Sequence, residues 1–480
     1  MRVPNRHKHA RNATAVLLRV VQAAFACFDF LLMPIPILFP IEVTSRELDA
    51  RLLLAAHCAG EGRTVFLGQD RGIYRLARRW RGGIYVGKQI LVGGQKPNLT
   101  KYRVLKERGF RVMFLAEEEP VFGEEADLDR DQFLQMFHPN WLDSDDVICA
   151  WGEFSAEVFR SAARPDAAAI HVTGHPRFDL CKPELACMYE SETEAIRKRF
   201  GKFILLNTKF ALASNLPAFL SVKNAFTGQV AGGDAAEYWL QFHAYHARLQ
   251  TAYIVLTNRL RKEFPDYHIV LRPHPGEDPA CYNAVLGGIK NVSVLTEGSV
   301  LPWLAAASVL VHTGCTTGLE ACHLTPRIIQ YAPDVGYVFE QHLPSLVGAV
   351  CGTEDEVVRE IRGGTRLTVE PAAERRISRI IANFSPQLMS SERIGALVAE
   401  EAKKMPASAT QGRLAELEHL ARSLVQPRNQ RQRKAGGVPR KFEPFEPAVI
   451  NAKLRVLEGL VGKRLKSRLI SRFMVEISAA

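Results

Sequence analysis

The stretch LRPHPGED (Leu271–Asp278) follows a short apolar run that is typical of a buried parallel strand. A second stretch, HTGCTTGLEA (His312–Ala321), follows another such run and leads into an apolar segment that predicts a helix. Both stretches should lie at the carboxyl edge of a parallel sheet, where open α/β sheets bind their ligands. Unpaired N–H groups at a helix start favour anions. We therefore expect a phosphate-bearing ligand, most simply a nucleotide, between these two turns.

Outward from these turns, short apolar runs alternate with amphipathic stretches along most of the chain. One series of this alternation covers residues 31–180 and a second covers 200–385, with a charged, proline-containing joint between them. Strand–helix alternation at this spacing predicts parallel, doubly wound sheets. The sequence thus predicts an α/β protein with two Rossmann-like domains that face a cleft, the architecture called GT-B.

The two ends of the chain are more basic than its body. Residues 1–30 form a basic, amphipathic segment whose apolar part is interrupted by Arg19, Gln22 and Asp29, so it predicts an amphipathic helix rather than a membrane-spanning anchor. Residues 405–480 contain 15 Lys and Arg against 6 Asp and Glu. We expect three segments after the second domain: a helical return over 386–425, a basic linker over 426–447 and a basic amphipathic helix over 448–480.

That last helix has two interpretations. Such a helix adsorbs to an anionic membrane surface, which would attach the protein peripherally to the inner membrane. Alternatively, it packs back on the first domain and exposes a solvated basic face. The sequence leaves both open.

The overall composition limits the class of protein. The 480 residues are 47% hydrophobic and 24% charged, as in a soluble protein of more than one domain. The nine cysteines are odd in number and include no CxxC pair, which indicates reduced thiols in a cytoplasm and no structural zinc site. Because the positive charge is concentrated at the ends, we expect no nucleic-acid partner.

The candidate donor-binding residues all follow predicted strands of the second half. A guanidinium matches phosphate oxygens, an imidazole donates to a leaving oxygen, and hydroxyl groups at a helix start hold phosphate. Alternatively, the helix caps itself, with Glu320 as the capping acid, and Arg272 pairs with Glu277 or Asp278. The donor-side candidates are Asn207, Thr208, Lys209, Arg272, His274, Thr313, Thr316, Thr317 and Glu320.

The candidate acceptor-side residues lie in the first half. Three carboxylates, Glu117 to Glu119, end a predicted strand, where Glu117 or Glu118 would serve as a general base or a nucleophile. The alternative is a solvated acidic loop. Glu42 and Lys88 follow two other strands and are expected to face the same cleft. We expect Arg177 and Asp179 to pair with each other and lock the joint between the domains.

The two turns and the pattern around them resemble a known family. The RPHPGED turn and the HTGCTTGLEA turn resemble the HP and Ser/Thr motifs of bacterial GT-B glycosyltransferases that use CMP-activated acidic sugars, such as sialyltransferases and Kdo transferases. SRELDARLLLA, AWGE, VTGHPRFDL and LLNTKF extend a likeness to the surface carbohydrate biosynthesis protein family over about 35–385. The acidic triplet is similar in place to the D/E-D/E-G motif, with Pro120 where Gly is expected. CDP-glycerol glycerophosphotransferases have a comparable HP turn.

The resemblance implies specific roles for these residues. His274 would contact the donor phosphate and assist the leaving nucleotide, Thr316 and Thr317 would hold that phosphate, and Glu320 would bind the ribose. Glu117 or Glu118 would act on the acceptor hydroxyl, or on the anomeric carbon if configuration is retained. Such enzymes need neither metal nor cofactor, because Arg, His and a helix start neutralise the leaving group.

Together these observations predict a cytoplasmic glycosyltransferase, peripherally associated with the inner membrane, that acts in surface polysaccharide biosynthesis of the capsule or lipopolysaccharide type. Its partners would be a nucleotide sugar, such as a CMP-linked acidic sugar, and a glycan or lipid-linked acceptor. Three alternatives stay open: a CDP-glycerol glycerophosphotransferase, a UDP-sugar epimerase, and a non-catalytic protein that binds a nucleotide sugar or organises polysaccharide assembly.

Overall fold

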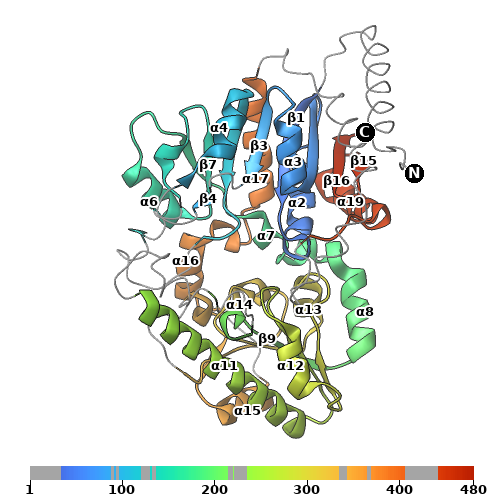
Figure 1. Cartoon of the computed structure of the whole chain (residues 1–480). Helices are drawn as coiled ribbons and strands as arrows, with labels where there is room; N and C mark the ends of the chain where they lie inside the picture. The colour runs from blue at the N-terminus through green and yellow to red at the C-terminus, as the bar shows by residue number, and fades with distance from the viewer. Residues whose placement is uncertain are drawn as a thin grey trace, which may run out of the picture.

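The computed structural model describes residues 34–87, 91–92, 97–119, 130–131, 134, 137–214, 220, 235–334, 343–364, 369–405 and 442–480. It contains two α/β domains, one above the other in Figure 1, and each is built around a central sheet. The prediction of a GT-B architecture is confirmed. One buried apolar cluster continues from the first sheet through Phe178, Tyr189 and Trp303 to the second sheet, so the joint between the domains is packed like a core.

The first domain has an eight-stranded sheet in the order β15-β16-β2-β1-β3-β6-β7-β8. All neighbouring strands from β2 to β8 are parallel, whereas β15 and β16 are antiparallel. The inner strands are buried on both faces, as parallel strands between helices must be, and their sequences are continuous apolar runs. The strands are β1 (Ile35–Ile41), β2 (Arg63–Gln69), β3 (Gly83–Gly87), β6 (Phe110–Leu115), β7 (Val147–Ala150), β8 (Ala169–Val172), β15 (Leu465–Ser471) and β16 (Met474–Ala479).

Helices cover both faces of this sheet. α2 is buried nearly all round because α17 and α19 also pack against it. The close approach of α17 depends on Gly395, since a Cβ there would lie 2.8 Å from the Cβ of His57. The helices are α2 (Thr44–Cys58), α3 (Asp70–Ala77), α4 (Thr100–Glu107), η1 (Pro139–Trp141), α6 (Glu153–Ala162), α7 (Pro176–Asp179), α16 (Pro371–Ile380), η4 (Ala382–Phe384), α17 (Ser390–Lys403) and α19 (Pro447–Val461). A short pair, β4 (Leu91–Val92) and β5 (Pro97–Asn98), stands apart from the sheet.

The second domain has a six-stranded parallel sheet in the order β11-β10-β9-β12-β13-β14. The chain enters at β9, adds β10 and β11 on one side, and then returns to place β12 on the other side of β9. The point where the strand order reverses therefore lies between β9 and β12, and such points bind ligands in open α/β sheets. The strands are β9 (Phe203–Asn207), β10 (His268–Arg272), β11 (Val292–Val294), β12 (Val309–His312), β13 (Ile328–Tyr331) and β14 (Ala349–Cys351).

The helices of the second domain and the joint complete the fold. The longest of them, α11, crosses the lower domain in Figure 1. α8 leads from the joint into β9 and packs on α13. The helices are η2 (Pro183–Tyr189), α8 (Glu190–Phe200), α9 (Ala211–Ser214), α11 (Ala235–Glu263), α12 (Pro279–Leu286), α13 (Leu301–Ala306), α14 (Thr317–Ala321), η3 (Leu343–Leu346) and α15 (Glu354–Gly363).

The C-terminal tail differs from the prediction. The amphipathic helix expected over 448–480 ends at Val461, where Gly462 adopts a φ of 65°, a conformation that glycine accepts without strain. The remaining residues form the β15–β16 hairpin, and β16 pairs with β2 of the first sheet. The apolar face of α19 is buried with Ile450, Leu454 and Leu457, so it is not available to a membrane. The alternative, that the tail packs on the first domain, is correct.

The predicted N-terminal segment over 1–30 and most of the basic linker over 426–447 lie outside the described residues. Among the helices that the structure describes, none combines the length and the apolar character needed to cross a bilayer.

Candidate functional site

Four strands of the second domain end in one row at the carboxyl edge of the sheet. In the register of the parallel ladders, Arg272 of β10 lies beside Asn207 of β9, Asn207 lies beside His312 of β12, and His312 lies beside Gln330 of β13. The two turns singled out in the sequence therefore meet on either side of β9. They do so at the point where the strand order reverses, which is the expected position for a ligand.

Several buried polar atoms near this row have no hydrogen-bond partner among the residues that the structure describes. Buried polar groups are nearly always satisfied by protein or water, so a group of unpaired atoms indicates a place for water or a ligand. Burial lowers the pKa of His312 to about 3, and its Nδ1 accepts the N–H of Gly314 at 3.1 Å, so a neutral ring carries its proton on Nε2. The unpaired atoms are Asn207 Oδ1, His312 Nε2, Thr313 Oγ1 and Gln330 Oε1.

The turn after β12 lies over this row. Lys209 donates from Nζ to the carbonyl oxygen of Gly314 at 3.1 Å, which brings its positive charge to the turn. The predicted capping of α14 is not present, since Thr316 makes no side-chain cap hydrogen bond and Thr317 contacts the Cys315 thiol. α14 is also only five residues long, so hydroxyl groups and backbone N–H groups, rather than a long helix dipole, are what this turn offers to an anion.

Two donor-side candidates have structural roles instead. Arg272 is buried over the Trp303 ring, and its guanidinium donates to the carbonyl oxygens of Glu297 and Gly298 at 2.7 and 2.5 Å, so it does not face the row. Burial lowers the pKa of Arg272 to about 10. The Thr208 hydroxyl donates to the carboxylate of Glu277 at 2.8 Å. These side chains are engaged with protein partners in this structure, and phosphate binding by them stays a prediction.

Glu277 is a residue that the sequence analysis missed as a functional element. Its buried carboxylate accepts the N–H of His274 at 2.9 Å as well as the hydroxyl groups of Thr208 and Tyr282, and thereby shapes the HP turn. The sequence did contain a signal for this role, because Glu277 follows His274 by three residues, a spacing at which a carboxylate can accept a backbone N–H within the same turn. Arg272 does not pair with it, contrary to the alternative considered above. The His274 side chain is exposed, and its Nδ1 accepts the N–H of Gly276 at 3.0 Å.

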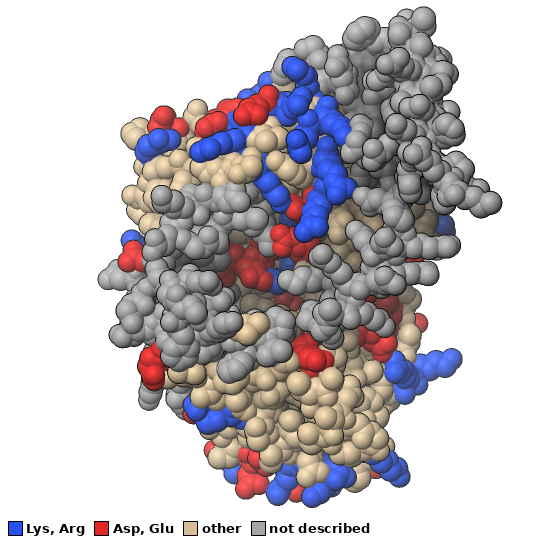
Figure 2. Space-filling view, in the orientation of Figure 1, with Lys and Arg blue, Asp and Glu red and all other residues tan. Residues whose placement is uncertain are grey.

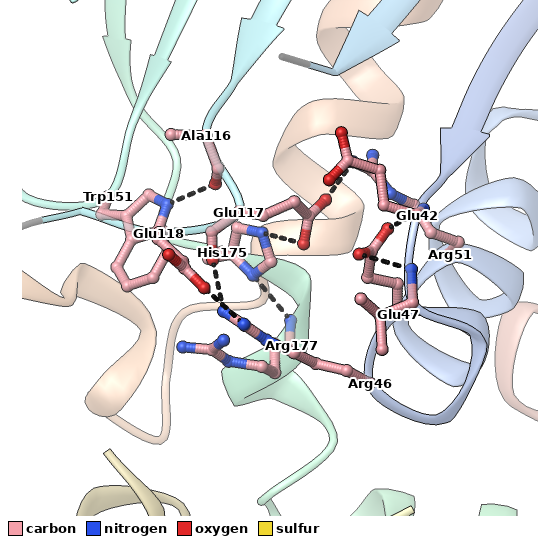
Figure 3. Close-up of polar contacts among 12 residues, drawn as sticks. Glu42, Arg46, Glu47, Arg51, Ala116, Glu117, Glu118, Trp151, His175 and Arg177 are labelled. Carbon is pink, nitrogen blue, oxygen red and sulfur yellow. Dashed lines mark hydrogen bonds and ion pairs between the residues drawn. The ribbon is translucent and has the colours of Figure 1, made fainter. Parts of the chain in front are cut away.

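Across from this row, the first domain presents a carboxylate–imidazole pair (Figure 3). Glu117 is buried beyond the end of β6, where it pairs with Arg51 and lies 3.5 Å from Nε2 of His175. Burial alone would raise the pKa of Glu117, but Arg51, His175 and Arg46 outweigh it and hold this pKa well below its ordinary value. Glu117 is therefore a fixed negative charge rather than a ready proton acceptor.

The backbone sets the tautomer of His175. Its Nδ1 accepts the N–H of Arg177 at 3.1 Å, so the proton of the neutral ring is on Nε2 and points toward Glu117. Burial lowers the pKa of His175 to about 4. Neither ring nitrogen is available to take a proton from a substrate in this arrangement.

The three consecutive carboxylates occupy three different environments. The Glu118 side chain is 65% exposed and accepts a hydrogen bond of 2.5 Å from Arg46 (Figure 3). Glu119 is buried, accepts the N–H of Trp151 at 3.3 Å, and leaves Oε2 without a partner among the described residues. Burial raises the pKa of Glu119 to about 8. Of the two predicted catalytic carboxylates, Glu118 is the one that a substrate can reach.

The two domains are joined by an ion pair at the cleft. Nε of Arg177, in α7, lies 3.3 Å from Oε1 of Glu320, in α14, and both side chains are only 7% exposed. The resemblance assigned Glu320 to the donor ribose, whereas here its carboxylate is paired across the domains. Arg177 does not pair with Asp179, contrary to expectation. The Asp179 carboxylate instead accepts the N–H groups of Ser390 and Ser391 and fixes the start of α17.

The residues of this cluster line a shallow depression that has no enclosed room for a water molecule. Its lining includes Glu47, whose pKa burial and the neighbouring Glu117 raise to about 7. The Glu47 carboxylate accepts the N–H groups of Glu42 and Val43 and so holds the turn between β1 and α2. Glu42 itself is exposed at that turn. Lys88, predicted on the acceptor side, lies outside the described residues.

One group of carboxylates has the spacing of metal ligands. Asp143, Asp145 and Asp146 lie close together, but the ammonium group of Lys106 is already among them, 2.7 Å from Asp145 and 2.8 Å from Asp146. The cation position is thus filled by a side chain.

Comparisons with known proteins give similar folds at low identity. The UDP-GlcNAc 2-epimerase of Methanocaldococcus jannaschii, solved with UDP-GlcNAc and UDP, is 11% identical over 77% of this chain and 100% of that chain, with a TM-score of 0.43. The wall teichoic acid polymerase TagF, solved as a variant soaked with CDPG, is 13% identical over 77% of this chain and 89% of that chain, with a TM-score of 0.42. No protein-family model matches the sequence, and no curated protein is similar to it.

Proposed function

We propose that this protein is a GT-B glycosyltransferase that takes a sugar from a nucleotide donor bound at the β9–β12 switch point. The observation that carries the proposal is the row of unpaired polar atoms, Asn207 Oδ1, His312 Nε2, Thr313 Oγ1 and Gln330 Oε1, at the position where such sheets bind ligands. The exposed carboxylate of Glu118 follows a strand of the opposite domain. A donor site on this edge and a proton acceptor on the facing domain are what transfer between two substrates would require.

On the donor side, amide and hydroxyl groups of the row would hydrogen-bond the nucleotide, and cationic or neutral donors around it would bind the phosphate. Lys209, the exposed His274, and the hydroxyl groups of Thr316 and Thr317 surround the turns on either side of β9. Such donors stabilise the charge that develops on a leaving nucleotide without a metal ion. The reaction should therefore proceed unchanged in the presence of a chelator.

On the acceptor side, Glu118 would accept the proton of the attacking hydroxyl. Its carboxylate is exposed, and Arg46 orients it through a hydrogen bond. Glu117 would act indirectly, as a buried negative charge that Arg51 and His175 hold in place. Glu47 would position this wall of the cleft, since its buried carboxylate holds the N–H groups of Glu42 and Val43.

The finer assignments are supported by the motifs of the sequence. The HP and Ser/Thr turns resemble those of enzymes that use CMP-linked acidic sugars, so we propose a donor of that class. The acceptor would be a growing or lipid-linked glycan of a surface polysaccharide, of the capsule or lipopolysaccharide type. The reaction would take place on the cytoplasmic side of the inner membrane, with the protein attached peripherally.

Calorimetric titration of the full chain with CMP, CDP and UDP tests the donor site. We expect one nucleotide to bind, and Thr313→Ala to weaken it about tenfold because a hydroxyl that faces the ligand is lost. Thr251→Ala is the matched control, since Thr251 is exposed on α11 and bonds only within its own helix. Failure of all three nucleotides to bind would favour a scaffold protein over a transferase.

Product analysis separates the remaining activities that share this type of site. Incubation with a nucleotide sugar alone yields an altered sugar nucleotide only if the protein is an epimerase. Transfer of glycerol phosphate from CDP-glycerol would identify a glycerophosphotransferase. A glycosyltransferase instead releases the nucleotide only when an acceptor glycan is added.

A further inference from the structure

A line of arginines on α3 is not explained by the donor and acceptor residues described above. Residues 70–81 contain five arginines and one acidic residue. The acid, Asp70, is paired with Lys101 of α4 at 2.6 Å, so it does not neutralise any of the arginines. Within the described parts of the chain, no carboxylate pairs with the exposed Arg71, Arg75 or Arg78.

The helix places these side chains on one face. Arg71 and Arg75 of α3 and Arg78, the C-cap residue that still has helical φ and ψ, follow each other at steps of four and three residues. Such positions are neighbours about 5–6 Å apart on an α-helix. The opposite face of α3 is buried with Ile73, Leu76 and Ala77, which fixes the arginine face outward. Figure 2 shows Lys and Arg side chains gathered in a band over the part of the first domain where Figure 1 shows α3.

The band leads to the cleft. α3 begins directly after Gln69, the last residue of β2, and Gln69 lies beside Ile41 at the carboxyl edge of the first sheet. Arg71 is therefore near the cleft, and Arg78 lies about 10 Å farther along the helix, given a rise of about 1.5 Å per residue. In Figure 2 the band descends from the outer end of the first domain toward the cleft between the domains.

We infer that this arginine face of α3 binds a linear anionic polymer, the growing glycan, and guides its end into the cleft. The inference rests on the proposed function, because it names the acceptor of that reaction by its chemistry. Guanidinium groups pair with carboxylates and phosphates through two parallel hydrogen bonds, and a row of them matches charges repeated along a chain. A narrow line of cations that ends at a cleft fits a polymer chain.

The alternative partner for this positively charged face is the surface of an anionic lipid bilayer. Surfaces that bind membranes commonly add apolar side chains that enter the lipid. The large apolar side chains exposed on the described surface lie on other elements, and none belongs to α3 or α4. The described residues thus favour a polymer.

The test measures binding of the full-length protein to fluorescent polygalacturonate, a carboxylate polymer, and to polyphosphate, with vesicles rich in anionic lipid as a separate arm. The triple variant Arg71→Gln/Arg75→Gln/Arg78→Gln should bind the polymer at least about tenfold more weakly. Its plot of log affinity against log salt should become shallower by about 2–3, as release of counterions from three contacts requires. Thermal melting checks that the variant is folded.

The matched control Arg248→Gln/Arg259→Gln/Arg362→Gln removes the same charge from the exposed surface of the second domain. An equal loss of polymer binding in the control would overturn the inference, because it would show that only net charge matters. Loss of vesicle binding with unchanged polymer binding would also overturn it and identify a membrane surface instead. If the wild-type protein binds the polymer through α3 but binds no nucleotide, the proposed transferase function is wrong, whereas the inference that this surface binds an anionic polymer still holds.

Discussion

Breaking the buried ion pair between Arg177 and Glu320 should loosen the contact between the two domains. Both side chains are 7% exposed and their charged atoms are 3.3 Å apart. At an effective dielectric constant of about 20, the attraction at this distance is about 5 kcal/mol, and desolvation of both groups offsets part of it. Burial lowers the pKa of Arg177 and raises that of Glu320, and in each case the partner's charge acts against the shift.

A double-mutant cycle measures this coupling. Arg177→Met and Glu320→Gln should each reduce the free energy of unfolding by about 3 kcal/mol, because each leaves one buried charge without its partner. The double variant should lose far less than their sum, giving a coupling energy of about 2–3 kcal/mol. Urea unfolding followed by tryptophan fluorescence provides these values for both domains. The matched control is the exposed pair Arg199–Glu297, whose coupling should stay below about 1 kcal/mol.

Two results would refute this reasoning. A coupling energy no larger than that of the exposed pair would mean that the buried pair does not join the domains. The second concerns the ribose. Suppose that Glu320→Gln weakens binding of CMP but not of 2′-deoxy-CMP, and that the cycle gives no coupling energy between Arg177 and Glu320. Glu320 would then bind the ribose hydroxyl groups, as the resemblance implied.

Three further substitutions test other parts of the cleft. Glu118→Gln should lower turnover by about 10²–10⁴-fold, the usual contribution of a general base, with nucleotide affinity unchanged; equal turnover would reject this base. Glu119→Gln should remove a pH dependence. Burial raises the pKa of Glu119 to about 8, so the folded protein keeps a proton that the unfolded chain releases above about pH 4.5. The free energy of unfolding of the wild type should therefore fall between pH 5 and pH 8 by about 3 kcal/mol more than that of the variant, as measured by urea unfolding. Gly318→Ala places a Cβ 2.6 Å from the buried imidazole under α14 and should reduce nucleotide affinity about tenfold in calorimetry. Gly363→Ala, with no atom within 4 Å of its Cβ, should leave that affinity unchanged.

The strands, the helices and their common edge could be predicted because they depend on local pattern. The two series of strands and helices expected over 31–180 and 200–385 correspond to the two sheets of the structure, since apolar periodicity is a local signal. The meeting of the HP turn and the Thr-rich turn follows from the geometry of any parallel sheet, in which all carboxyl ends share one edge. Asn207, at the end of β9, was placed correctly for this reason.

The directions of long side chains could not be predicted, because distant residues decide them. Arg272 turns away from the cleft toward Trp303 and the carbonyl groups after β11, which lie 25 or more residues along the chain. Glu320 pairs with Arg177 from the other domain. No spacing rule within one motif contains that information.

The tail was misread for a different reason. Apolar residues from Ile450 to Phe473 recur at three- and four-residue steps, so the period alone suggests one helix. Gly462 was the local signal that the helix ends, and the alternation after it suits an edge hairpin. Pairing with β2 then decided the outcome, because the antiparallel strand β16 satisfies an otherwise open edge of the sheet.

Arg177 connects the two halves of the cleft. Its backbone N–H fixes the tautomer of His175, which in turn faces Glu117, while its guanidinium pairs with Glu320 of the donor domain. A rotation that separates the domains would take Glu320 away from Arg177 and remove a contact that holds the Arg177 backbone against His175. His175 stays neutral near pH 7 in either arrangement, because its pKa is already lowered to about 4. Contact between the two domains therefore stabilises the backbone hydrogen bond that orients His175, and with it the arrangement of the acceptor side.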